Sequence, residues 1–158
     1  MADQTRPGAV LFESDTDPEI GYSRLWINLL RIQRSTMARI ARELRDQGIG
    51  DPIWHEILIQ IDRAGDSGIV MADLESRLYC PQYALSRHVA RLEDLGLIRS
   101  AATLGPGRSK RVMMTAAGRD KNAAMWPVYA RIIREEFATR LSTEEAYHIV
   151  RYLIRLYP

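Results

Sequence analysis

The sequence has one cysteine, three histidines and no long apolar run, and each shortage excludes a class of protein. A single cysteine cannot form an internal disulfide, and so few cysteines and histidines cannot supply most structural zinc sites. No apolar run approaches the roughly 20 residues that a membrane-spanning helix needs. The acidic N-terminal segment does not have the pattern of a signal peptide. We therefore expect a cytoplasmic protein with no metal site and no membrane partner.

The short motifs of common enzymes are also missing. The chain has no glycine-rich phosphate loop, no paired nucleophile and base, and no H-E-x-x-H spacing for a metal. His55, His88 and His148 fall on three separate predicted helices without a local acidic motif, so we expect surface or half-buried positions for them. The sequence therefore predicts neither an enzyme nor a cofactor.

The residues that are present have the profile of a soluble globular protein. The chain has 158 residues, of which 46% are hydrophobic and 27% are charged. This length suffices to bury a hydrophobic core without disulfides.

Positive charge is concentrated in one segment of the chain. Residues 77–111 contain seven basic and two acidic residues, a local charge of +5 in a chain whose net charge is +2. Arginine richness is general, because 20 of the 22 basic residues are arginine, so the clustering is the informative feature. A local basic excess predicts a polyanionic partner at one part of the surface.

Helical periodicity divides the chain into four segments. We expect a flexible N-terminal tail over 1–16, a long amphipathic helix within 17–50, a compact lobe over 51–115 and further helices over 116–158. Asp17-Pro18 begins the first helix, and helices over 18–47, 52–63, 72–78 and 116–140 follow from the apolar spacing. A capping box at Ser142–Glu145 begins the last helix.

A helix-turn-helix is predicted over residues 72–96. After a short helix, Pro81 begins a second helix whose buried side is formed by Leu85, Val89, Leu92 and Leu95, and which Gly96 ends. Two strands follow, over 97–103 and 108–114, around the turn-forming run Leu104–Gly107. A basic hairpin directly after a helix-turn-helix is a wing. The fold class expected is mainly α with a small β wing.

Two motifs in this region are similar to those of the MarR family of transcription regulators. Ala84–Ile98 resembles the family's recognition-helix block, and Gly107–Gly118 resembles the wing and the segment that follows it. Leu141–Glu145 is also family-like. Two positions differ: Pro106 stands where the family usually has aspartate, and Tyr83 stands where it often has a small residue. The resemblance implies a winged helix-turn-helix with N- and C-terminal dimerisation helices.

A helix fits the major groove of DNA, where arginine can bind guanine and hydroxyl groups can reach base edges. We expect bases or adjacent phosphates to be contacted by Gln82, Tyr83, Ser86 and Arg87, and the backbone by Arg91. The resemblance assigns Arg108 to the minor groove. Lys110 and Arg111 are expected at phosphates, although alternation along a strand sends them to opposite faces. The alternative is that these cations only solvate an exposed surface.

The resemblance also implies a homodimer and a small aromatic or phenolic ligand that weakens DNA binding. The first, fifth and sixth helices carry enough apolar surface for a dimer interface, and the alternative is an ordinary intrachain core. Candidate ligand-lining residues are Trp26, Arg31, Trp54 and His55, because aromatic walls beside a cation suit an aromatic acid. The two tryptophans lie on apolar stripes, and tryptophans in such positions more often belong to the core.

These observations predict a sequence-specific regulator that binds double-stranded DNA, acts as a repressor and binds a palindromic operator as a homodimer. Two alternatives remain open at this point. One is a winged helix that binds another protein, and the other is a nonspecific DNA binder without a ligand response. The +5 segment argues against the first alternative.

Overall fold

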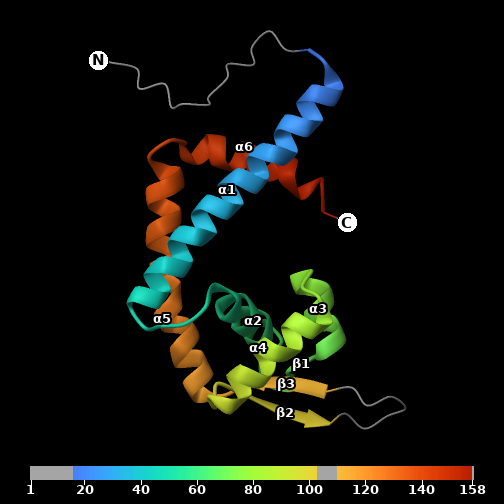
Figure 1. Cartoon of the computed structure of the whole chain (residues 1–158), viewed down its shortest axis with the longest axis vertical. Helices are drawn as coiled ribbons and strands as arrows, with labels where there is room; N and C mark the ends of the chain where they lie inside the picture. The colour runs from blue at the N-terminus through green and yellow to red at the C-terminus, as the bar shows by residue number, and fades with distance from the viewer. Residues whose placement is uncertain (1–15, 103–109, 158) are drawn as a thin grey trace. The chain divides into compact units, whose positions relative to one another are not determined.

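A computed structural model describes residues 16–102 and 110–157 of the chain. These residues are mainly α-helical with one small antiparallel sheet, as the sequence predicts (Figure 1). The elements follow in the order α1 (Pro18–Asp46), α2 (Pro52–Arg63), the 3-10 turn η1 (Gly65–Ser67), β1 (Ile69–Val70), α3 (Met71–Leu78), α4 (Gln82–Asp94), β2 (Ile98–Ala102), β3 (Lys110–Met114), α5 (Ala116–Ile133), the π-helical turn η2 (Arg134–Ala138) and α6 (Thr143–Ile154). The predicted hairpin turn and Arg108 lie outside the described residues.

Two compact units make up the chain, and their boundary falls within α1, after Ser35. In the first unit, Asp17 caps α1 by accepting a hydrogen bond from the Glu19 amide at 2.9 Å. Tyr22, Leu25 and Trp26 follow on this half of the helix with exposed side chains. The apolar residues of this half are therefore not part of a core within their own unit.

The second unit contains the sheet, in which β3 lies between β1 and β2 (Figure 1). Both pairings are antiparallel, with Ile69 opposite Val112 and Ile98 opposite Met114. The two-residue β1 thus adds a short edge to the hairpin. This sheet and helices α2, α3 and α4 enclose the larger core cluster, which includes Ile57, Leu58, Ile61, Leu74, Leu85, Val89, Leu92, Ile98 and Val112.

A second core cluster joins the C-terminal half of α1 to α5. Ile40 and Leu44 of α1 pack with Met125, Val128 and Ile132 of α5. Trp54 of α2 packs against this cluster and the larger one. The end of α1 and most of α5 are therefore fixed to the lobe that contains the helix-turn-helix.

Three details of the sequence prediction are wrong. Leu95 is 43% exposed, because α4 ends at Asp94 and the chain turns at Gly96, so Leu97 enters the core instead. Helical spacing also places Ile133 on the buried side of the helix expected over 116–140, but this side chain is 40% exposed at the last turn of α5. The α-helix expected over 116–140 ends at Ile133 and continues as the π-helical turn η2.

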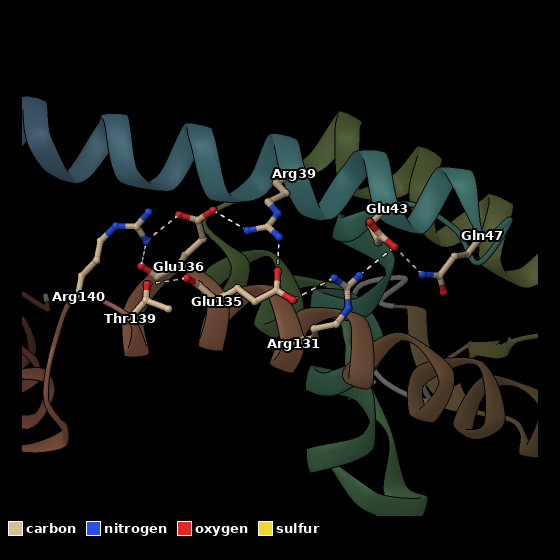
Figure 2. A network of polar contacts seen from close by, with 8 residues as sticks. All are labelled: Arg39, Glu43, Gln47, Arg131, Glu135, Glu136, Thr139 and Arg140. Atoms are coloured by element: carbon tan, nitrogen blue, oxygen red, sulfur yellow. Dashed lines mark hydrogen bonds and ion pairs between the residues drawn. The ribbon is translucent and has the colours of Figure 1, made fainter. Parts of the chain in front are cut away.

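An ion-pair network links α1 to the end of α5 and to η2 (Figure 2). Arg39 binds both Glu135 and Glu136, and its distance to Glu136 is 2.7 Å. Arg131 pairs with Glu43 of α1 at 2.9 Å and with Glu135 at 3.3 Å. Consecutive residues on an α-helix do not face each other, so the π-helical turn allows two successive carboxylates to reach one guanidinium.

Within residues 16–102 and 110–157, no helix is long and apolar enough to cross a membrane.

Candidate nucleic-acid interface

Helices α3 and α4 are joined by a three-residue turn, Tyr79–Pro81, which completes the helix-turn-helix. Pro81 is the N-cap of α4, where its missing N–H costs no helical hydrogen bond. Leu85, Val89 and Leu92 face the core with exposed fractions of at most 1%. The opposite side of α4 is therefore free to face a partner.

All five predicted contact residues of α4 are exposed. At 100° per residue they cover about half of the helix circumference, from Gln82 beside the buried Val89 round to Arg91. The tyrosine is 73% exposed. We call this surface the α4 face, and it consists of Gln82, Tyr83, Ser86, Arg87 and Arg91. It combines two guanidinium groups with an aromatic ring, a hydroxyl and an amide, which are the groups that read base edges and phosphates.

The two long strands of the sheet, β2 and β3, form the base of the wing and are fastened to α4 by Glu93. Its carboxylate accepts a hydrogen bond from the Ser100 amide of β2 at 2.9 Å and from Lys110 Nζ of β3 at 2.7 Å. The Lys110 ammonium and the Ser100 donors lower the pKa of the Glu93 carboxyl, although partial burial opposes them. The family usually has an aspartate near the wing arginine where this chain has Pro106, and Glu93 fixes the wing base from another position.

Arg111 lies on the other face of β3 from Lys110. Its guanidinium donates to the backbone oxygens of Ser67 at 3.1 Å and Gly68 at 3.0 Å. Arg111 therefore holds η1 against the sheet, and its predicted contact with phosphate stays a prediction. Lys110 lines one cavity together with Gln82 and Ser86 of the α4 face, whereas Arg111 does not.

The family-like segment that follows the wing has a structural role. Thr115 caps α5 by accepting from the Gly118 amide at 3.0 Å, and its hydroxyl lies 2.8 Å from the Leu97 carbonyl. A Cβ atom at Gly118 would lie 2.0 Å from that same carbonyl oxygen. Glycine is therefore required here for α5 to start directly against the end of α4.

The candidate ligand residues do not form one cluster in the structure. Trp26 and Arg31 lie on the first unit's half of α1, and both are exposed. Trp54 lies in the second unit and lines a cavity of about 460 Å³. The cavity also contains three cations that sequence reasoning did not select for it, from α1, α4 and α5: Arg45, Arg91 and Lys121. Within the described residues, none of the three pairs with a carboxylate.

His55 is 3% exposed, so the expected surface or half-buried position is wrong for this residue. It lies between α2 and α5, where Nδ1 is 2.7 Å from Asn122 Oδ1. The ring also stacks on Trp126 at 6.1 Å and packs against Tyr129 at 4.3 Å, measured between ring centroids. Burial lowers the pKa of His55, against the effect of the hydrogen bond to Asn122. His55 does not line the cavity next to Trp54.

In the described part of the chain, no group of three or more histidine, cysteine, aspartate or glutamate side chains could hold a metal ion.

A helix-turn-helix followed by a hairpin fastened to its second helix defines the winged helix-turn-helix class of proteins. The model of the MarR family matches residues 51–109, which run from the start of α2 into the wing. This match confirms the resemblance that the sequence motifs indicate. No curated protein matches the chain.

Several solved structures of MarR-family regulators share the fold. A mutant MarR of E. coli in complex with operator DNA is 17% identical, with a TM-score of 0.75 over 90% of this chain and 100% of that chain. Sco3205 of Streptomyces coelicolor in complex with DNA is 16% identical, with a TM-score of 0.76 over 91% and 90%. The organohalide-sensing regulator RdhR-CbdbA1625, bound to 2,4-dichlorophenol, is 21% identical, with a TM-score of 0.73 over 93% and 86%. The chain thus has the fold of MarR-family transcriptional regulators.

Proposed function

We propose that the protein is a sequence-specific transcriptional regulator that binds a palindromic operator as a homodimer and represses transcription. The observation that carries this proposal is the α4 face, which exposes Tyr83, Arg87 and Arg91 on a helix whose other side is buried. A recognition helix of this kind fits the major groove. Arg87 is the residue that we expect to bind a base, while Arg91 contacts the backbone.

The experiment is fluorescence anisotropy with labelled duplex DNA from upstream of the gene, with scrambled duplex as the reference. Arg87→Ala should lose about ten- to hundredfold in affinity for the operator, the range for one bidentate base contact, and much less for scrambled DNA. Arg63→Ala, at the exposed end of α2, is the matched control. Equal losses on both duplexes would assign Arg87 to phosphate, and unchanged binding would remove it from the interface.

Exposed apolar surface on the terminal helices supports the homodimer. Seven apolar or aromatic residues of the C-terminal segment are between 43% and 75% exposed, namely Tyr147, Ile149, Val150, Tyr152, Ile154, Leu156 and Tyr157. A second copy of the chain would cover this surface and place two recognition helices about one DNA turn apart. The alternative, a winged helix that binds another protein, would be favoured if the chain were monomeric and bound no duplex.

We assign a ligand that releases DNA to the cavity lined by Trp54, without the other three residues that the sequence suggested, Trp26, Arg31 and His55. Its indole wall and the three cations suit a flat aromatic anion. Arg91 belongs both to this cavity and to the α4 face, so a bound anion would remove a phosphate contact. Benzoate should weaken operator binding by the wild type but not by Lys121→Met. An equal effect on both proteins would place the ligand elsewhere.

A further inference from the structure

Tyr79, in the turn between α3 and α4, has a backbone conformation that tyrosine rarely adopts. Its φ of 48° and ψ of 32° lie in the left-handed region. Among the described residues it is the one non-glycine residue with a positive φ. A bulky side chain in this region is a true outlier, because its Cβ crowds the following carbonyl oxygen.

Elsewhere the chain uses glycine wherever the described backbone has a positive φ. These positions are Gly48, Gly50, Gly65, Gly68 and Gly96. Glycine at position 79 would remove the strain, so a tyrosine there needs a compensating interaction.

Packing against the described part of the chain does not provide that compensation. The Tyr79 side chain is 78% exposed. It has no side-chain hydrogen bond or ring contact with any residue in the described ranges. The next two residues of the turn are anchored to the protein. Cys80 packs against the larger core cluster, and Pro81 is the N-cap of α4. The ring is therefore held at the surface by a turn that is itself anchored.

The place of Tyr79 indicates what the ring contacts. It lies three residues before Gln82, at the end of α4 that a recognition helix directs towards the bases. A turn at this end passes the sugar-phosphate backbone at the edge of the groove. Tyrosine hydroxyls are among the groups that donate hydrogen bonds to phosphate oxygens.

We propose that Tyr79 is a further DNA-contacting residue, whose phenolic O–H donates a hydrogen bond to a phosphate beside the groove occupied by α4. This inference rests on the proposed function. A phosphate contact positions the protein and reads no sequence, so its loss affects all duplexes equally. A neutral phenol also leaves the salt dependence of binding unchanged, whereas loss of an arginine or lysine contact reduces it.

Two variants separate the hydroxyl from the backbone strain. Tyr79→Phe keeps the ring and the strain, and we expect roughly threefold to tenfold weaker binding to operator and scrambled duplex alike, with an unchanged salt slope. Tyr79→Gly removes both, and we expect equally weak binding with a midpoint of thermal unfolding no lower than that of the wild type. Arg63→Ala, at the exposed end of α2 and outside both the α4 face and the proposed dimer surface, is the control and should bind as the wild type does.

Wild-type affinity in Tyr79→Phe overturns the proposal, as does a loss confined to the operator. A lower unfolding midpoint in Tyr79→Gly also overturns it, because the ring would then be part of the packing. If the wild type binds no duplex, the proposed function fails and this inference fails with it. Normal wild-type binding with an unaffected Tyr79→Phe removes the inference alone.

Discussion

His55 is the one buried polar side chain in the described part of the protein. Its Nδ1 is paired with Asn122, while Nε2 is buried and has no partner among those residues. Protonation would place a charge between α2 and α5 where no described carboxylate is bonded to the ring. The pKa of His55 is therefore lower in the folded state than in the unfolded chain, so folding favours the neutral imidazole.

The sign of the pH dependence follows from that difference. The stabilisation from His55 is complete above its ordinary pKa of 6.5 and is lost as the pH falls from there towards the lowered folded value. Urea unfolding at pH 7.5, 6.5 and 5.5 should show a falling free energy of unfolding. The fall should be smaller in His55→Gln than in the control His148→Gln, which changes an exposed ring. Equal falls in both variants would contradict this assignment.

Gly118 stands where the backbone leaves no room for a side chain. A Cβ atom there would meet the Leu97 carbonyl and Met114 Sδ at 2.0 and 2.8 Å. Gly118→Ala should therefore lower the free energy of unfolding by about 1–3 kcal/mol, the usual cost of overpacking. Ala117→Gly, at the exposed neighbouring position, is the control and should cost at most about 1 kcal/mol. Chemical denaturation measures both, and a stable Gly118→Ala would show that α5 can move.

At the scale of elements, the Glu93 carboxylate joins α4 to both strands of the wing base. Glu93→Gln should weaken the contact with Lys110 and retain an oxygen for the Ser100 amide. An exposed ion pair is worth up to about 1 kcal/mol, so the folded state should be nearly as stable as in the wild type. DNA binding should suffer more than stability, because the wing would lose its fixed position relative to the recognition helix.

A double-mutant cycle of Glu93→Gln and Lys110→Met, measured by operator binding, tests this link. We expect the two losses to be less than additive, since either variant breaks the same pair. Strict additivity would show that Lys110 acts on phosphate independently of Glu93. In that case Lys110→Met alone should also reduce the salt slope by about one.

The network in Figure 2 acts between elements in the same way, because it ties α1 to α5 and η2 through exposed charges. Arg39→Met should lower the midpoint of thermal unfolding in low salt. The difference from the wild type should shrink as salt rises, because screening weakens exposed pairs. Arg42→Met, at an exposed position on α1, is the control. A difference that does not change with salt would point to lost packing by the arginine stem.

The sequence predicted the elements well because each one carries a local signal. Apolar spacing located the helices, and Asp17 and Ser142 marked two helix starts with caps that the structure confirms. The same periodicity could not tell which element would cover each apolar or polar face. His55 was therefore expected at a surface or half-buried position, and the pairing of Arg39 with Glu135, which lies 96 residues away, left no signal.

In the candidate site, too, the features set by local periodicity could be predicted and the contacts between distant segments could not. Exposure of all five α4 residues followed from the helix period, because one side was clearly apolar. The attachment of Lys110 to Glu93 and of Arg111 to Gly68 depends on contacts between distant segments, so their structural roles could not be read from charge alone.

For the whole molecule, the exposed apolar residues of α6 predict a dimer. Ile154→Asp would place a charge in the proposed interface, and its side chain is 55% exposed in the single chain, so the fold should survive. Sedimentation should report a monomer at concentrations where the wild type is dimeric, with an unchanged circular dichroism spectrum. A dimeric Ile154→Asp would show that α6 faces solvent and that other helices carry the interface.

Sequence-specific DNA binding is best tested by anisotropy of the wild-type protein with DNA from upstream of its own gene, over a salt series, against scrambled duplex. We expect tight binding to the upstream DNA, two chains per site and a steep decrease in affinity with salt. Equal, weak binding to both duplexes would contradict a sequence-specific regulator and leave a nonspecific DNA binder. No binding to either duplex at low salt would contradict the assignment of the α4 face to DNA altogether.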